Sequence, residues 1–119
     1  MALSSRFQKL AADAKTRIKE ISAKEASDQQ KAGAMLIDVR ETEDFAKEHA
    51  EGAVHLSRGT IELKIEEKVP DTTSPIICYC GGGSRSALAA DNLQKMGYTN
   101  VVSMAGGFKS WKDQGLPIS

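Results

Sequence analysis

The chain has few of the side chains that build disulfide frameworks or metal centres. Its 119 residues include two cysteines, Cys78 and Cys80, and two histidines, His49 and His55. No second cysteine pair completes a structural zinc set, so we expect no metal site. Cysteines two apart on a strand point the same way and would close a strained ring, so we expect free thiols in a reducing compartment.

Net charge and long apolar runs are also missing. Sixteen basic and sixteen acidic residues leave no strong field to attract nucleic acid or an anionic membrane. No window approaches the length of a membrane-spanning helix, and the first residues show no basic segment followed by an apolar stretch. We therefore expect a cytoplasmic protein without nucleic-acid or membrane partners, and a monomer, because no long apolar stripe is left over.

What is present is an alternation of strand-like and helix-like segments, in a length that fits one domain. Short apolar or alternating runs, typical of strands, occupy residues 17–21, 34–39, 53–56, 76–80 and 100–104. The first of these runs also continues the periodicity of the helix before it, so that its assignment stays open. The order predicts an α/β fold in which an open parallel sheet of about five strands is flanked by helices.

Capping signals indicate where the first three helices begin. Ser4 or Ser5 can cap an amphipathic N-terminal helix. Ser22 and Glu25 have the spacing of a capping box, which predicts a second helix directly after them. Thr42 is expected to cap a brief third helix.

Cys80 stands where an apolar strand pattern gives way to a helical one. The loop between them consists of Gly81, Gly82, Gly83, Ser84, Arg85 and Ser86. The first turn of a helix has unpaired N–H groups and a positive partial charge, so a thiolate there, beside Arg85, is stabilised and reactive. Glycines can adopt positive φ and turn N–H groups inward into an anion-binding nest. A flexible linker is the other interpretation of the glycines, but a short βα loop fits better between a strand and a helix that pack together.

Other polar residues fall at strand ends, where open parallel sheets bind ligands. We count Arg58 among the candidate anion-binding residues and interpret Arg40 as one partner of an ion pair. Asp38 is expected to be buried and paired, because an isolated buried carboxylate is too costly. Phe108 and Trp111 are explained by the packing of an amphipathic last helix.

Structural roles are also the simpler interpretation of several residues near Cys80. His49 and His55 are expected to be hydrogen-bonded scaffold residues, and Cys78 a core residue. Ser84 and Ser86 can hydrogen-bond the sulfur or cap the helix, and capping is the more general role.

Four segments together resemble the single-domain rhodaneses, a family of sulfurtransferases. They are residues 36–41, 49–55, 80–86 and 106–111. With their spacing they cover most of the chain from about Ile18 to Pro117. We expect residues 1–16 to be an N-terminal helical extension of a rhodanese domain over residues 17–119. Glu51 departs from the family, which often has proline at this turn.

The resemblance implies sulfur transfer by double displacement. Cys80 would accept a sulfane sulfur from a donor such as thiosulfate and hold it as a persulfide. It would then pass the sulfur to an acceptor, which is cyanide in an assay and a thiol or protein in the cell. Arg85 would help to bind the anionic donor, no cofactor is required, and loop groups would cradle the outer sulfur. These are Gly81, Gly82, Gly83, Ser84 and Ser86.

Two alternatives remain open. Cysteine phosphatases, including those with a rhodanese fold, and arsenate reductases are the nearest enzymatic rivals. Four residues separate Cys80 from Arg85, whereas the phosphatases have five, and the shorter loop suits one sulfur atom better than a tetrahedral phosphate. A rhodanese-like binding or regulatory module is the second alternative, although such modules usually lack the cysteine that this chain keeps.

Overall fold

The computed structural model describes residues 4–119 and contains a five-stranded sheet with the strand order β1-β5-β4-β2-β3. Every pairing between neighbouring strands is parallel. The strands are β1 (Lys19–Ile21), β2 (Met35–Asp38), β3 (Val54–His55), β4 (Ile76–Tyr79) and β5 (Val101–Met104). The predicted α/β fold is therefore confirmed, with residues 19–21 as an edge strand.

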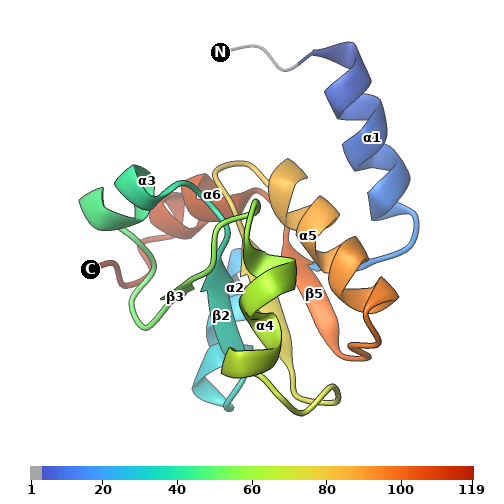
Figure 1. Cartoon of the computed structure of the whole chain (residues 1–119). Coiled ribbons are helices and arrows are strands. Elements are labelled where there is room, and N and C mark those ends of the chain that lie inside the picture. Colours follow the sequence, from blue (N-terminus) through green and yellow to red (C-terminus); the bar gives the residue numbers. More distant parts are fainter. Residues whose placement is uncertain (1–3) are drawn as a thin grey trace.

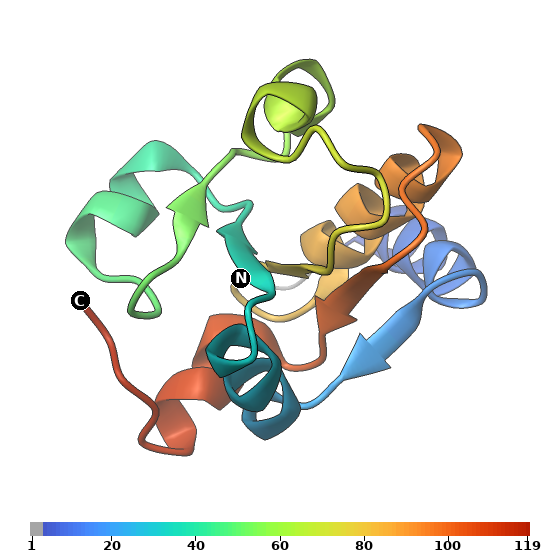
Figure 2. The same ribbon diagram turned by 90° about the horizontal axis from the view of Figure 1, so that it is seen from below.

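Helices cover both faces of the sheet (Figures 1 and 2). They are α1 (Ser5–Lys15), α2 (Ala23–Lys31), α3 (Thr42–Lys47), α4 (Ile61–Lys68), α5 (Ser84–Lys95) and α6 (Gly107–Asp113). One buried cluster joins α4 and α5 to the sheet, and a second joins α2 and α6 to the opposite face. Burial on both faces explains why the strands are continuously apolar.

Two of the three predicted caps are confirmed. The Ser4 hydroxyl accepts from the N–H of Phe7, and Ser22 forms a capping box with Glu25. The prediction for Thr42 was wrong, because Thr42 is the first residue of α3 and the cap position before it makes no side-chain bond. Acidic residues in the first turn of α3 stabilise its start instead.

The N-terminal helix lies outside the two layers and packs on α5 (Figure 1). Ala11 and Ala14 are the buried residues of α1. Arg17, just after the helix, donates two hydrogen bonds to the Asp91 carboxylate of α5, at 3.0 and 2.8 Å. Lys15, the last residue of α1, also lies 3.7 Å from the Glu20 carboxylate of β1. Small residues and two ion pairs therefore attach this helix to the sheet domain.

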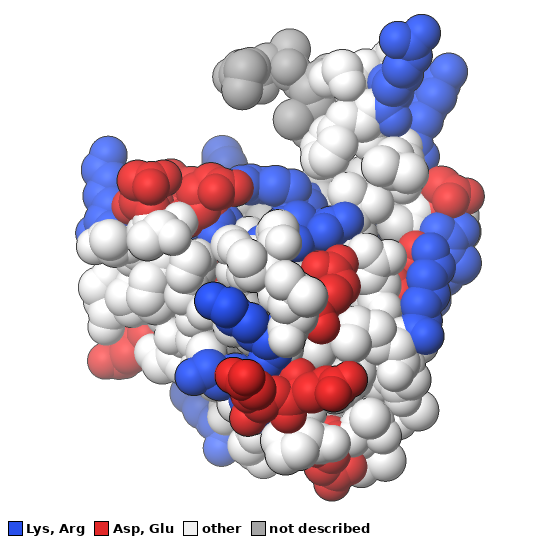
Figure 3. Space-filling view, viewed as in Figure 1, with Lys and Arg blue, Asp and Glu red and all other residues white. Residues whose placement is uncertain are grey.

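Charge is mixed over the surface. In Figure 3 basic side chains stand on the outer part of α1 and acidic ones gather over α3, with both signs interspersed between them. No helix within residues 4–119 is long and apolar enough to cross a membrane. The same residues contain no group of His, Cys, Asp and Glu side chains that is suited to hold a metal ion.

Candidate active site

The carboxyl ends of three neighbouring strands meet at one edge of the sheet. The N–H of Val39, after β2, donates to the carbonyl of Tyr79 in β4 at 2.9 Å. The N–H of Arg58, after β3, donates to the carbonyl of Val39 at 2.9 Å. Cys80 follows β4 directly, so these backbone bonds bring the segment that holds Cys80 beside the two segments that hold Arg40 and Arg58.

The Cys80 sulfur lies at the first turn of α5. It accepts hydrogen bonds from the backbone N–H groups of Gly83 at 3.1 Å and Ser86 at 3.4 Å. The Ser86 hydroxyl lies 3.5 Å from the same sulfur. Cys80 is only 2% exposed, and around it Gly82 is exposed while Gly81 and Arg85 are partly exposed. The arrangement is a buried sulfur surrounded by hydrogen-bond donors, which is suited to hold negative charge, beside partly exposed loop residues.

The glycines of this loop do not all have the conformation that the nest model expects. Gly83 has φ of +107° and is the cap residue of α5, but Gly81 and Gly82 do not have positive φ. A Cβ on Gly83 would lie 3.3 Å from the backbone nitrogen of Gly106. One left-handed glycine thus suffices to aim N–H groups at the sulfur, and close packing against the segment before α6 adds a second reason for glycine there.

The first turn of α6 donates backbone hydrogen bonds to the Cys80 loop. The N–H of Phe108 donates to the Cys80 carbonyl at 2.7 Å, and the N–H of Lys109 donates to the Gly81 carbonyl at 3.3 Å. Gly107 has φ of +55°, and a Cβ there would lie 2.7 Å from the carbonyl carbon of Gly81. The role of Gly107 was not predicted from the sequence, although two glycines between a strand and a helix were a usable signal for close backbone approach.

Arg85 lies over the mouth of the loop. A Cβ on Gly81 would be 3.8 Å from its Nη2 atom. Across residues 4–119 no hydrogen bond or ion pair occupies its guanidinium, which distinguishes it from Arg17, Arg40 and Arg58. A partly exposed guanidinium without a partner is suited to bind an anion that enters the loop.

Of the two roles expected for the loop serines, helix capping is not observed, whereas a hydrogen bond with the sulfur is observed for Ser86. Gly83 occupies the cap position and α5 has no side-chain cap. The Ser86 hydroxyl is fully buried and lies between the Cys80 sulfur and the Ser103 hydroxyl, 2.8 Å from the latter. Ser84, the first residue of α5, makes no side-chain hydrogen bond within the described chain.

Arg58 is directed along α4. Its Nη1 atom lies 3.3 Å from Glu62 Oε2, which also accepts from the amide of Asn92 at 2.8 Å. Its Nε atom is buried and has no hydrogen-bond partner in residues 4–119. Within the described residues no hydrogen bond or ion pair joins this side chain to the Cys80 loop, and donor binding by Arg58 stays a prediction.

Arg40 and Asp38 form a buried ion pair, as the sequence predicted for the carboxylate. Arg40 Nη2 and Asp38 Oδ2 are 2.8 Å apart, and the Tyr79 hydroxyl donates to the same oxygen at 2.7 Å. Burial, together with the neighbouring Asp38, raises the pKa of Tyr79. The Arg40 guanidinium also lies 4.4 Å from the centre of the Phe108 ring. This network ties β2 and β4 to α6 beneath the loop.

The remaining candidates are scaffold residues. His49 bonds through Nδ1 to the Phe45 carbonyl at 2.8 Å, and His55 through Nε2 to the Arg40 carbonyl at 2.7 Å. Cys78 is fully buried, and burial raises the pKa of its thiol to about 12, with the nearby Cys80 as a second cause. Both cysteines are free. The predicted structural roles of these three residues agree with the geometry.

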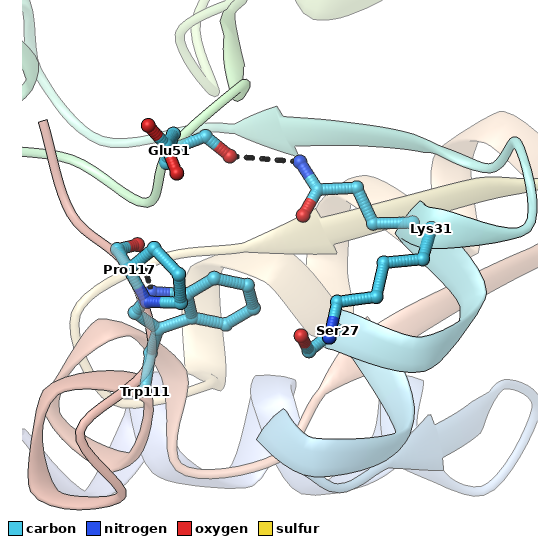
Figure 4. Close-up of a pocket in the computed structure, with 6 residues that line it drawn as sticks. Ser27, Lys31, Glu51, Trp111 and Pro117 are labelled. Carbon is cyan, nitrogen blue, oxygen red and sulfur yellow. Dashed lines mark hydrogen bonds between the residues drawn. The ribbon is translucent and has the colours of Figure 1, made fainter.

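Two surface hollows differ in their relation to Cys80. The first, of about 270 Å³, lies between α2, α6 and the C-terminal segment (Figure 4). Its lining residues are Ser27, Gln30, Lys31, Glu51, Trp111 and Pro117. None of them belongs to the Cys80 loop or carries a nucleophilic thiol. The second, of about 330 Å³, adjoins the loop at Gly81 and is also lined by Phe108, Lys109, Lys112 and Asp113. Only this second hollow adjoins the sulfur site.

Comparison with known proteins gives one consistent family. The family model described as Rhodanese-like domain matches residues 22–114. The thiosulfate sulfurtransferase GlpE of Haemophilus influenzae (strain PittEE) is 42% identical over 100 residues, which are 84% of this chain and 93% of that protein.

Solved structures have the same fold. The polysulfide-sulfur transferase homodimer of Wolinella succinogenes aligns with a TM-score of 0.83 and 26% identity, over 97% of this chain and 88% of that one. A protein of unknown function from Rhodopseudomonas palustris, described as a possible tyrosine phosphatase, aligns with a TM-score of 0.84 and 27% identity, over 100% of this chain and 98% of that one.

Proposed function

The chain belongs to the rhodanese-like domain family and is a sulfurtransferase, and on this premise we propose that it carries sulfur as a persulfide on Cys80. Thiosulfate, or another small anionic sulfane-sulfur compound, is the proposed donor. A thiol, free or on a protein, is the proposed acceptor, and cyanide replaces it in an assay. The relative from Haemophilus influenzae, which is named as a thiosulfate sulfurtransferase, supports this choice of donor.

One observation carries the proposal: the Cys80 sulfur accepts N–H bonds from Gly83 and Ser86 at the start of α5, at 3.1 and 3.4 Å. These donors and the positive end of the helix stabilise negative charge that develops on the sulfur during transfer. The thiolate attacks the outer sulfur of thiosulfate and forms a new S–S bond. The original S–S bond breaks, and sulfite leaves with its electron pair.

The second half-reaction reverses the roles of the sulfur atoms. The thiolate of the acceptor, or cyanide, attacks the outer sulfur of the persulfide, and the Cys80 thiolate leaves with the electron pair of the broken S–S bond. The same N–H groups then stabilise a leaving group instead of a nucleophile. No net oxidation and no cofactor are needed.

Positive charge at the loop assists the first step, in which two anions meet. Arg85 is proposed to bind the sulfonate end of the donor, since its guanidinium has the geometry for two parallel hydrogen bonds and has no hydrogen-bond or ion-pair partner within residues 4–119. Exposed Gly82 and partly exposed Gly81 and Ser84 line the opening through which the donor passes. Gly83 and Ser86 contact the sulfur itself.

The intact mass of the protein after thiosulfate treatment, before and after cyanide, tests the proposal. We expect a gain of one sulfur that cyanide removes, no gain in Cys80→Ser, and an unchanged gain in Cys78→Ala, the matched control in the buried strand. Absence of the gain with a reduced Cys80 would contradict thiosulfate as donor. Hydrolysis of p-nitrophenyl phosphate that depends on Cys80 would then favour a phosphatase, and neither activity would favour a binding module.

We also propose a monomer in the cytoplasm, where a reducing environment keeps both cysteines as thiols. The large exposed apolar residues of the described chain stand on four different segments. They are Leu10, Leu63, Met96 and Ile118. Light scattering is expected to give the mass of one chain, 12.8 kDa. Twice that mass would contradict the monomer.

A further inference from the structure

Two buried serine hydroxyls form a row behind the Cys80 sulfur. Ser86 Oγ lies 3.5 Å from the sulfur, and Ser103 Oγ lies 2.8 Å from Ser86 Oγ. Both serines are fully buried. Ser103 is on β5, where its register partner is Cys78 on β4. The row therefore runs from the sheet, through the first turn of α5, to the reacting atom.

Ser103 is out of place as a packing residue. The other residues of β5, Val101, Val102 and Met104, are buried and apolar. A buried hydroxyl costs free energy unless it is hydrogen-bonded. Within residues 4–119 the Ser103 hydroxyl has one partner, the Ser86 hydroxyl. A polar group in this strand is thus accounted for by its link toward Cys80.

Counting protons shows which sulfur species the row fits. The Cys80 sulfur, the Ser86 oxygen and the Ser103 oxygen are joined by two hydrogen bonds, and the two hydroxyls supply one proton each. With a thiolate at the end, Ser103 donates to Ser86 and Ser86 donates to the sulfur, and both protons are used. With a thiol the row runs the other way, from the sulfur to Ser86 and from Ser86 to Ser103, and the Ser103 proton then has no acceptor in the row. The row therefore favours a sulfur that only accepts.

We propose that Ser103 is a positioning residue for sulfur transfer: its hydroxyl donates to Ser86 and so fixes the Ser86 hydroxyl as a donor to the Cys80 sulfur. This inference rests on the proposed function of Cys80. The effect is cooperative, because a hydroxyl that accepts a hydrogen bond becomes a better donor. It assists Cys80 both as nucleophile and as leaving group.

The rate at which iodoacetamide alkylates Cys80, measured against pH from the mass of the Cys80 peptide, tests this role without any sulfur donor. We expect Ser103→Ala to raise the pH at half-maximal rate by about half a unit and to lower the rate at pH 7 about threefold. Ser27→Ala is the matched control, since Ser27 is equally buried but lies on α2 at the other hollow. An unchanged profile in a folded Ser103→Ala protein would overturn the proposal.

A second pair of variants separates the hydroxyl from packing. Ser103→Thr and Ser103→Val have side chains of nearly equal volume, but only threonine keeps a hydroxyl that can donate to Ser86. The alkylation rate of Cys80 against pH should therefore stay unchanged in Ser103→Thr and shift in Ser103→Val. Equal profiles would overturn the proposal, and this comparison also serves if Ser103→Ala does not fold.

A double-mutant cycle tests the path of the effect. If Ser103 acts through Ser86, the shift caused by Ser103→Ala should disappear in a Ser86→Ala background. A shift that persists there would overturn the proposed route. Failure of the proposed function would be detected separately, as a wild-type protein that gains no sulfur from thiosulfate. The alkylation profiles of the wild type and Ser103→Ala can be compared in either case, because alkylation needs no sulfur donor.

Discussion

At the scale of single residues, Arg85 and Arg58 are the two guanidinium candidates for the donor. Arg85 has no partner in the described chain, whereas Arg58 is paired with Glu62. We expect Arg85→Ala to lower kcat/KM for thiosulfate about 10- to 100-fold, the cost of one or two hydrogen bonds to a charged group. Arg85→Lys should retain only part of the wild-type kcat/KM, because an ammonium group cannot form two parallel hydrogen bonds with the sulfonate.

Arg58→Ala is the comparison for this prediction, measured in the same steady-state assay. We expect kcat/KM for thiosulfate to change less than about threefold, because the Arg58 guanidinium is paired with Glu62 along α4 and contributes little charge at the loop. A loss at Arg58 as large as that at Arg85 would support Arg58 as a donor-binding residue and contradict the small effect expected here.

The sequence was most informative where chemistry and local structure coincide. Cys80 was predictable as a sulfur at a strand-to-helix turn, and Ser86 as one of two residues able to reach it. Ser103 was not predictable, because it comes 17 residues after Ser86 and only the pairing of β4 with β5 brings it there. The buried ion pair of Asp38 was predictable from its apolar neighbours, but the third member, Tyr79, is 41 residues away.

At the scale of elements, the contact between α6 and the Cys80 loop depends on Gly107. A side chain there would have to tolerate φ of +55° and a Cβ 2.7 Å from the Gly81 carbonyl carbon. We expect Gly107→Ala to lower the free energy of unfolding by about 2–4 kcal/mol. It should also remove most sulfur-transfer activity, because the loop carbonyls lose their N–H donors.

Gly115→Ala is the matched control, since Gly115 has φ of +69° but nothing within 4 Å of an added Cβ. It measures the backbone strain alone, about 1 kcal/mol. Denaturant unfolding of both variants and their turnover of thiosulfate check the prediction. Equal effects of the two substitutions would show that close approach to the loop is unimportant.

The attachment of α1 to α5 predicts a pH dependence. The hydrogen bond from Arg17 holds the pKa of Asp91 below its ordinary value. A carboxyl with a lowered folded-state pKa stabilises the fold at pH above the unfolded value, about 4, and this stability is lost as the pH falls through the folded value.

Thermal unfolding between pH 2.5 and 6 checks this dependence. Asp91→Asn should melt below the wild type at pH 6, and the gap should narrow as the pH falls below about 4. Asp13→Asn is the control, because Asp13 also pairs with Arg17 but its side chain is 63% exposed. A gap that is constant over the whole range would contradict the role of the Asp91 charge.

Helix starts could be predicted from the sequence only where a side chain makes the cap. Ser4 and Ser22 cap with their own hydroxyls. Thr42 has the same chemistry but stands one residue too late, and α5 has Gly83 at its cap position and therefore no side-chain cap. The start of α5 is instead fixed by backbone N–H groups that bond the Cys80 sulfur, a tertiary contact that local patterns do not contain.

At the scale of the whole molecule, the alternation of apolar and helical segments was enough to predict the parallel sheet. Short βα connections allow few other arrangements, because crossovers between parallel strands need helices on the faces. The alternation did not predict the strand order. The first strand, β1, lies at the edge of the sheet and pairs with β5, which follows it in the sequence by more than 80 residues. Pairings of that length depend on packing that no local pattern specifies.

The predicted boundary between residues 1–16 and the domain is the last point to test. The helix α1 contacts the rest of the molecule through Ala11, Ala14, the ion pair of Lys15 with Glu20 and the segment that follows it, and it contributes no residue to the Cys80 loop. A fragment of residues 17–119 retains Arg17 and its bonds to Asp91. We therefore expect it to fold, with a melting temperature about 5–10 °C lower because part of α5 becomes exposed. Its kcat/KM for thiosulfate and cyanide should stay within about twofold of the full chain.

Calorimetry measures the melting temperature of the fragment, and the steady-state assay measures its kcat/KM. A fragment that folds but transfers sulfur poorly would mean that α1 supports the loop through α5, and an unfolded fragment would make α1 part of the domain itself.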